Sequence, residues 1–259
     1  MTRDEMWLLQ EKYDGKKTEG FFADCIRLQN GEPLAYIIGH IPFLNTTIFL
    51  DSRPLIPRTE TEFWAEKIID TMHTYELRAQ GLSLGTLSVL DLCAGSGCIG
   101  VAVLSAIPMS RVDFCEIDPR HHPTIKKNII TNNINPSRAS IFGGDLFAEC
   151  THVYDFILTN PPYIDKELNR VEESVSTFEP ESALYGGKNG MEIIERIIIE
   201  SPKFLATHGT LVIEHEPEQT EPIRLLATSH DFASYSLPDQ YNISRYTILT
   251  RSSDEDMSQ

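Results

Sequence analysis

Short apolar runs alternate with amphipathic stretches from about residue 87 onward. Five runs, rich in β-branched and aromatic residues, have the length of buried strands, and helical spacing of apolar residues lies between most of them. The runs lie at 87–93, 111–116, 139–142, 154–158 and 210–214, and the clearest helical patterns lie at 97–107, 119–131 and 191–207. This alternation predicts an α/β fold with a doubly wound, mainly parallel sheet.

The end of the chain departs from that alternation. Two further apolar runs, at 232–237 and 245–250, are separated by only a short connection. A parallel pair needs a long crossover, so we expect these two strands to form an antiparallel hairpin and complete a seven-stranded sheet. Residues 252–259 are acidic and polar, and we interpret them as a disordered tail.

The first part of the chain has a different pattern. Residues 1–31 have loosely spaced apolar positions that predict a small helical segment. Between 32 and 57 the pattern changes to short apolar runs at 34–38 and 47–50, separated by turn-forming residues such as Gly39. We interpret 32–57 as a β-hairpin linker.

A helix is expected to follow the linker and open the main domain, which we place at 58–251. Thr59 or Thr61 can cap this helix, and Glu60 and Glu62 lie in its first turn, where acidic side chains favour the helix dipole. The predicted organisation is therefore a helical segment, a hairpin linker, one α/β domain and a tail.

Composition and charge narrow the protein class. The chain has 259 residues, 41% of them apolar, and five cysteines without a CxxC pair, so neither a disulfide framework nor a metal site is indicated. No export signal or membrane-length apolar run is visible, so we expect a cytoplasmic protein without membrane association. The formal net charge of -16 disfavours stable nucleic-acid binding and favours a protein partner.

A glycine-rich loop follows the first predicted strand. Gly95, Gly97 and Gly100 come directly after the strand end and open a helix, which lets the backbone approach a nucleoside ligand at the carboxyl end of the sheet. This spacing also matches a dinucleotide fingerprint, so the loop alone does not decide between NAD and S-adenosylmethionine. The candidate cofactor-binding residues here are Asp91, Cys93, Ala94, Gly95, Ser96 and Gly97.

Acidic residues follow the next two predicted strands. Glu116 ends the second strand, where a carboxylate can accept hydrogen bonds from both hydroxyls of a ribose in either cofactor. Asp145 follows the third strand and can meet an exocyclic adenine amine, while its neighbour Leu146 belongs to the same loop. Three acidic strand ends together favour a nucleoside ligand.

The fourth strand ends in Asn160, Pro161, Pro162 and Tyr163. The two prolines fix the backbone and remove two N–H donors, which leaves the Asn160 amide oxygen and the Pro161 carbonyl oxygen as acceptors. They suit the NH₂ group of an amide or aromatic amine, which could be aligned toward a reactive methyl group without a strong base. Tyr163 would stack on the acceptor or form a wall of its pocket, and Asn160 also adjoins the cofactor.

With these residues in view, the chain resembles the HemK/PrmC family of protein-glutamine N5-methyltransferases. The resemblance covers most of the chain, and the segments that carry it are 32–39, 55–62, the glycine loop, 144–147, 160–165, 178–184 and 211–215. It implies a class I methyltransferase-like fold, S-adenosylmethionine as cofactor, and methylation of the glutamine in the Gly-Gly-Gln loop of peptide-chain release factors.

The resemblance also implies roles for individual residues. Residues 93–97 and Glu116 would contact the cofactor, Leu146 would lie along the adenine, and residues 160–163 would hold the substrate glutamine. The helical N-terminal segment would help to dock the release factor. The chain differs from the family pattern in Cys93, where a glycine is usual, in Thr59, where a proline is usual, and in its short N-terminal segment.

Two other functions fit parts of the pattern. An adenine-N6 or guanine-N2 methyltransferase acting on nucleic acid also uses an Asn-Pro-Pro-Tyr motif, although the charge is unfavourable. A non-catalytic scaffold that kept the fold would not need the motif intact. We expect surface roles for His121 and His122 and no metal site there, because adjacent helical side chains point apart. Residues 214–216 could support the acceptor site from behind or end the strand in solvated charges, and we favour the solvated strand end.

Overall fold

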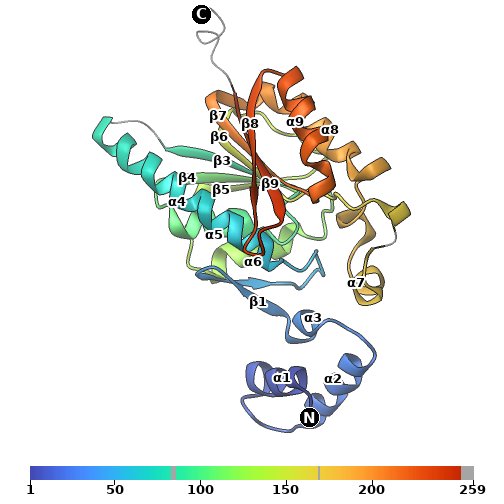
Figure 1. Ribbon diagram of the computed structural model, residues 1–259. Coiled ribbons are helices and arrows are strands. Elements are labelled where there is room, and N and C mark those ends of the chain that lie inside the picture. The colour runs from blue at the N-terminus through green and yellow to red at the C-terminus, as the bar shows by residue number, and fades with distance from the viewer. Residues whose placement is uncertain (83–85, 169, 252–259) are drawn as a thin grey trace, which may run out of the picture.

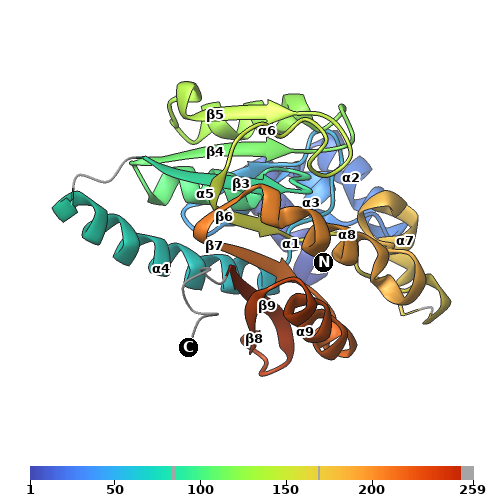
Figure 2. The ribbon, with the colours of Figure 1, turned by 90° about the horizontal axis from the view of Figure 1, so that it is seen from above.

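A computed structural model describes residues 1–82, 86–168 and 170–251 and contains a seven-stranded sheet in the order β5-β4-β3-β6-β7-β9-β8 (Figures 1 and 2). The sheet confirms the predicted fold class. The strands are β3 (Leu87–Leu92), β4 (Ser110–Cys115), β5 (Ala139–Phe142), β6 (Tyr154–Thr159), β7 (Leu205–Glu214), β8 (Phe232–Pro238) and β9 (Ser244–Arg251).

Strands β3 to β7 are parallel, and β9 pairs antiparallel with both β7 and β8. The final hairpin is therefore as predicted. After β3 the chain moves outward through β4 and β5 and then returns to β6 on the other side of β3. This reversal creates a crevice at the carboxyl ends of β3 and β6, which is where open α/β sheets bind ligands.

Alternating residues of the strands feed two separate cores. Val89 and Val212 pack on one face with α4 (Thr59–Leu82), α5 (Cys98–Ala106) and α6 (His122–Thr131). Leu90 and Leu211 pack on the other face with α8 (Glu192–Glu200) and α9 (Thr220–Ser229), while the short α7 (Glu173–Phe178) lies beside the carboxyl edge. Successive strand side chains point to opposite sides of the sheet, and here they are apolar on both sides. Helices therefore cover both faces of the sheet.

The N-terminal helices form a small unit with its own core (Figure 1). Helices α1 (Arg3–Tyr13) and α2 (Glu19–Gln29) begin at side-chain caps from threonines and pack together with α3 (Leu34–Ile38). The buried core residues are Leu8, Phe21, Cys25 and Ile37. Ion pairs then tie α2 to the linker: Glu32 binds Arg27 at 2.7 Å and Arg53 at 2.9 Å.

The linker differs from the prediction in one element. The apolar run at 34–38 is helix α3, and the hairpin is formed by β1 (His40–Phe43) and β2 (Thr46–Phe49). Pro33 precedes the helix, and Gly39 ends it with a φ of 95°, a conformation that glycine adopts without strain. The helical turn buries Tyr36, whose hydroxyl donates to the Pro54 carbonyl oxygen at 2.6 Å.

Helix α8 is shorter than the predicted 191–207. It ends at Glu200, a 3-10 turn follows over Ser201–Lys203, and β7 already begins at Leu205. Pro202 explains the early end, because proline lacks the N–H that a continuing helix requires. The predicted disordered tail, 252–259, lies outside the described residues. None of the described helices combines the length and the hydropathy required to cross a bilayer.

Candidate active site

A cavity of about 170 Å³ lies at the carboxyl ends of β3, β4 and β6. We call it the glycine-loop cavity. Its walls combine backbone of the glycine loop with apolar side chains and two acids. The lining residues are Leu55, Cys93, Gly95, Cys115, Glu116, Ile117, His121, Gly144, Asp145, Leu146, Asn160, Pro162, Ser182, Ala183 and Ile193.

The glycine loop has the backbone conformation that its sequence predicts. Gly95 adopts a φ of 55° at the cavity wall, and an added Cβ would have no neighbour closer than 4.0 Å, so the backbone is open to a ligand there. Gly100 serves packing, because a Cβ would lie 2.4 Å from the Phe114 ring. Cys93 also has a positive φ, 60°, which agrees with the usual glycine at this position.

Not every predicted cofactor residue reaches the cavity. Cys93, Gly95, Glu116, Asp145, Leu146 and Asn160 are on its wall. The other predicted positions are not part of that wall, and they support the glycine loop from its protein side. These positions are Asp91, Ala94, Ser96 and Gly97. Ala94, for example, donates its N–H to the Cys115 carbonyl oxygen at 3.0 Å, which joins the loop to β4.

Asp91 supports the start of helix α5. Its Oδ2 accepts the Gly100 N–H at 2.8 Å, and the side chain is buried beneath the loop. The other oxygen, Oδ1, is buried without a hydrogen-bond partner among the described residues. Burial raises the pKa of this carboxyl to about 8, because an isolated charge is costly away from water.

Glu116 and Asp145 have different surroundings. Glu116 is buried, and its oxygens accept the N–H groups of Gly95 and Asp118 at 2.7 and 2.8 Å. These contacts orient the carboxylate at the cavity wall and leave further lone pairs for a diol. Asp145 is exposed and forms an ion pair with Arg196 at 2.9 Å.

A second cavity, of about 250 Å³, lies beside the first. We call it the NPPY cavity after the residues 160–163. Asn160, Leu55 and Ala183 line both cavities, so these residues form a shared wall. The remaining lining residues are Arg58, Pro161, Tyr163, Ile164, Asp165, Leu168, Arg170, Val171, Glu172, Val175, Leu184, Asn189, Glu216, Glu218 and Gln219.

The two predicted acceptor atoms belong to residues that line the NPPY cavity, and one of these residues, Asn160, is also on the shared wall. Asn160 uses its Nδ2 to donate to Thr61 Oγ1 at 3.1 Å. Among the described residues, neither Asn160 Oδ1 nor the Pro161 carbonyl oxygen makes a hydrogen bond. Pro161 faces the NPPY cavity, whereas Pro162 faces the glycine-loop cavity.

A glycine-rich turn holds the backbone of this loop. An added Cβ at Gly186 would lie 2.4 Å from the Pro162 carbonyl oxygen, and one at Gly190 would lie 1.9 Å from the Tyr163 carbonyl oxygen. Only glycine permits such close approach. Gln219 adds a hydrogen bond from Nε2 to the same Tyr163 oxygen at 2.8 Å.

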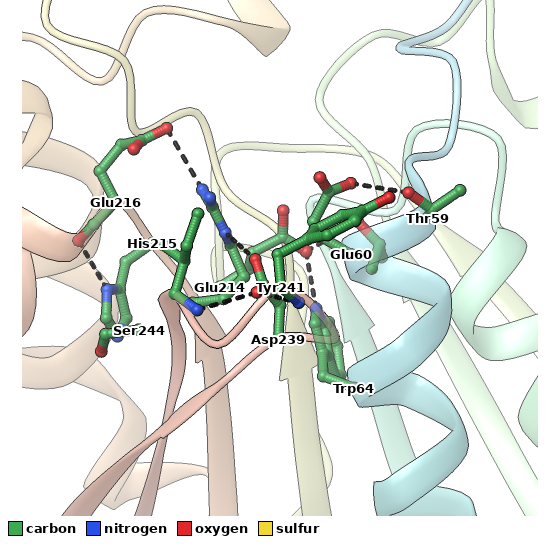
Figure 3. Close-up of polar contacts among 12 residues, drawn as sticks. Thr59, Glu60, Trp64, Glu214, His215, Glu216, Asp239, Tyr241 and Ser244 are labelled. Atoms are coloured by element: carbon green, nitrogen blue, oxygen red, sulfur yellow. Dashed lines mark hydrogen bonds and ion pairs between the residues drawn. The ribbon is translucent and has the colours of Figure 1, made fainter.

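Glu214 does not end the strand in solvent, contrary to the favoured expectation, whereas Glu216 is partly exposed. Glu214 is 1% exposed, and its carboxylate accepts hydrogen bonds from Trp64 Nε1 at 2.6 Å, Thr61 Oγ1 at 2.7 Å and Tyr163 Oη at 3.0 Å. Figure 3 shows the contact with Trp64. Burial raises the pKa of Glu214 in spite of these donors, which favour the charged form. His215 is also buried.

The surface role expected for His121 is also wrong, and His122 is only partly exposed. His121 is 5% exposed, lines the glycine-loop cavity and bonds through Nδ1 to the Ser52 hydroxyl at 2.8 Å. His122 bonds through Nε2 to the Glu116 carbonyl oxygen at 2.9 Å. Burial lowers the pKa of His121, so its neutral form is favoured. The adjacent side chains do point apart, but the linker and β4 cover both.

Two distant sequence segments meet beside the cavities. The Arg58 guanidinium forms an ion pair with Glu179 at 2.6 Å, and Glu179 also accepts the Ile56 N–H at 2.9 Å. The Glu179 side chain is 1% exposed. The pair thus fixes the strip 55–58 against the chain that follows α7 and places Leu55 on the shared wall.

Comparison with known proteins gives a consistent result. Residues 71–178 match the model of the methyltransferase small domain. The release factor glutamine methyltransferase of Bifidobacterium longum (strain NCC 2705) is 33% identical over 83% of this chain and 74% of its own length. That of Francisella tularensis subsp. tularensis is 30% identical over 90% of this chain and 79% of its own length.

The chain belongs to the release factor glutamine methyltransferase family. It is accordingly an S-adenosylmethionine-dependent methyltransferase. The glycine-loop cavity fits this cofactor: open backbone at Gly95, a buried carboxylate at Glu116 and apolar cover from Leu146 suit a nucleoside.

Solved structures with low sequence identity share the fold. The human METTL16 catalytic domain in complex with an RNA hairpin superposes with a TM-score of 0.60 at 16% identity and covers 81% of this chain and 77% of its own. The N-terminal domain of human METTL16 in complex with SAH gives 0.52 at 17% identity and covers 81% and 76%. These comparisons establish a class I methyltransferase-like fold.

Proposed function

We propose that this protein transfers the methyl group of S-adenosylmethionine to the side-chain amide nitrogen (N5) of the glutamine in the Gly-Gly-Gln motif of a peptide-chain release factor. The names of the relatives support this substrate. The formal net charge of -16 supports a protein acceptor over a nucleic acid, because phosphates would be repelled.

One observation carries the proposal. Asn160, on the wall that the two cavities share, and Pro161, on the wall of the NPPY cavity, each have an oxygen without a hydrogen-bond partner among the described residues: Asn160 Oδ1 and the Pro161 carbonyl oxygen. A primary amide has two N–H donors, so a glutamine that enters the NPPY cavity can donate one to each oxygen. Its nitrogen would then lie at the boundary with the glycine-loop cavity.

The glycine-loop cavity is assigned to the cofactor. Cys93 and Gly95 would contact it, with Ala94, Ser96 and Gly97 supporting that loop; Glu116 would accept from the ribose hydroxyls, and Asp145 and Leu146 would adjoin the adenine. Asp91 would act indirectly by holding the start of α5. When bound, S-adenosylmethionine supplies an electrophilic methyl group on a positively charged sulfur.

The protein would contribute by positioning. Asn160 and Pro161 would hold the amide nitrogen, the cofactor would supply the methyl group and keep the electron pair of the carbon–sulfur bond on its sulfur, and the nitrogen would release one proton to water. An amide lone pair is delocalised and weakly nucleophilic, so alignment is the main requirement, and correct alignment can be worth effective molarities of about 10⁵ M or more. Pro161 and Pro162 keep the acceptor oxygens in place, and Tyr163 walls the cavity.

The N-terminal segment is a candidate for docking the release factor. Its helices α1 and α2 expose large apolar side chains although they rest on their own core; these side chains are Met6, Trp7, Phe22 and Ile26. Exposed apolar groups of this size often mark interaction sites.

A cytoplasmic location is supported by the five cysteines, all of which are free thiols.

The test is a methylation assay with mass mapping. The protein is incubated with S-adenosylmethionine and a purified, unmethylated release factor, and the product is digested and sequenced by mass spectrometry. We expect one added methyl group on the Gly-Gly-Gln glutamine. Absence of that methyl group, or incorporation into ribosomal RNA or DNA offered in parallel, would contradict the proposal.

A further inference from the structure

The buried Glu214 network lies directly behind the shared wall. Glu214 ends β7, Thr61 and Trp64 belong to the first turns of α4, and Tyr163 belongs to the NPPY cavity wall. All three donors meet one carboxylate, and Thr61 then connects it to Asn160. Figure 3 shows the Trp64 ring pointing from α4 toward Glu214.

The direction of each hydrogen bond in this network follows from the donors. An indole N–H can only donate, so Trp64 requires Glu214 Oε2 to be an acceptor. The Thr61 hydroxyl contacts the same Glu214 oxygen and donates its single hydrogen to it. The Thr61 oxygen is then left with lone pairs only and can bind Asn160 solely through the Asn160 NH₂ group.

This direction decides which end of the Asn160 side chain faces the cavities. The oxygen and the nitrogen of an amide have nearly the same shape, so packing alone distinguishes them poorly. With Nδ2 held 3.1 Å from Thr61, Oδ1 is turned away from Thr61. The reversed amide would place Oδ1 against a hydroxyl oxygen that has no hydrogen to offer, and would present an NH₂ group to a substrate NH₂ group.

We propose that Thr61 and Glu214 are positioning residues that set the orientation of the Asn160 amide, so that an oxygen and not an NH₂ group meets the substrate. This inference rests on the proposed role of Asn160. It assigns a task to a carboxylate that is fully enclosed and touches neither cavity. Tyr163 belongs to the same arrangement, because its hydroxyl also donates to Glu214.

The test compares Thr61→Val with Thr61→Ser. Valine keeps the branched shape and removes the hydroxyl, whereas serine keeps the hydroxyl and removes a methyl group. For Thr61→Val we expect kcat with the release factor to fall on the order of 10-fold or more, with an unchanged Kd for S-adenosylmethionine measured by calorimetry. Thr61→Ser should recover most of the lost kcat.

Thr247→Val is the matched control. Thr247 is also a fully buried threonine, and its hydroxyl bonds to His215 and Ser236 at 2.7 Å each, but it lines neither cavity. Its loss should lower thermal stability to a similar degree and leave kcat near the wild-type value. If Thr61→Val does not fold, Thr61→Ala, which a helix tolerates well, takes its place with the same expected result.

Three outcomes would overturn the inference: wild-type kcat in Thr61→Val, equal impairment in Thr61→Ser, or an equal loss of kcat in Thr247→Val. The proposed function is tested separately by Asn160→Ala. An inactive Asn160→Ala beside a fully active Thr61→Val would reject the positioning role alone. An active Asn160→Ala would reject the function assigned to the NPPY cavity.

Discussion

The glycine-loop cavity and the NPPY cavity share Asn160 but are built in different ways. The first is made largely by one continuous region, the ends of β3 to β6 with their following loops. The second brings together the strip 55–58, the loop after β6, the turn before α8 and the residues after β7. Local backbone conformation shapes the first cavity, whereas buried polar contacts between distant segments shape the second.

With the cavities assigned as proposed, this difference would separate cofactor binding from methyl transfer. Changes on the cofactor side should alter affinity for S-adenosylmethionine, and changes on the acceptor side should alter the rate of transfer. The two effects separate only if the residues of the shared wall contribute more to the rate of methyl transfer than to the affinity for the cofactor. Substitutions on each side can therefore test it.

Asn160→Ala should have the greatest consequence. It removes the acceptor oxygen that aligns the substrate amide, so we expect turnover to fall by roughly 10²-fold or more. Calorimetry should show S-adenosylmethionine binding that remains close to wild type. Comparable losses of binding and of turnover would show that the shared wall serves mainly the cofactor.

Glu116→Gln should have the opposite pattern. The amide has one oxygen in place of two, so it loses hydrogen bonds to the glycine loop and to the expected ribose, and affinity for S-adenosylmethionine should fall by roughly 10-fold or more. At saturating cofactor, kcat should remain within about 3-fold of wild type. A large fall in kcat at saturation would contradict the separation of tasks.

Asp91→Asn should have the smallest effect, on stability alone. The folded-state pKa of Asp91 is raised from 3.8 to about 8. Its contribution to stability is therefore fully present below the unfolded pKa and is lost as the pH rises through about 8. The Tm of the variant relative to the wild type should rise by a few °C between about pH 5 and about pH 9. Differential scanning calorimetry of the cofactor-free protein measures this, and a constant difference would argue against a buried, titrating Asp91.

The same contrast explains what the sequence could predict. The strands, the glycine loop and the residues 160–163 depend on neighbours in the chain, and their patterns are recognisable without a structure. The sequence allows a supporting role for Glu214 near the acceptor but favours a solvated strand end, since its partner Trp64 lies 150 positions away and Thr61 has the pattern of a helix cap. A charged residue after a strand usually meets water, and only the fold reveals three buried donors.

The other errors have local causes. The run at 34–38 is too short for periodicity to separate strand from helix, and its flanking Pro33 and Gly39 are the features that favour a helical turn. The surface expectation for His121 and His122 depends only on adjacent side chains of a helix pointing apart. Ser52 of the linker and the end of β4 supply the partners that bury them, and neither contact is visible in the local pattern.

The ion pairs of Glu32 with Arg27 and Arg53 have a mechanical consequence. Arg53, which follows the hairpin, also lies over the ring of Tyr36 in α3, 4.5 Å from its centre, so the chain after the hairpin is joined by charge to the N-terminal helices. These contacts favour one placement of the helices relative to the hairpin and the chain that follows it. A release factor that docked on these helices would then be held at a defined distance from the NPPY cavity. Little conformational entropy would be lost in bringing its glutamine amide there.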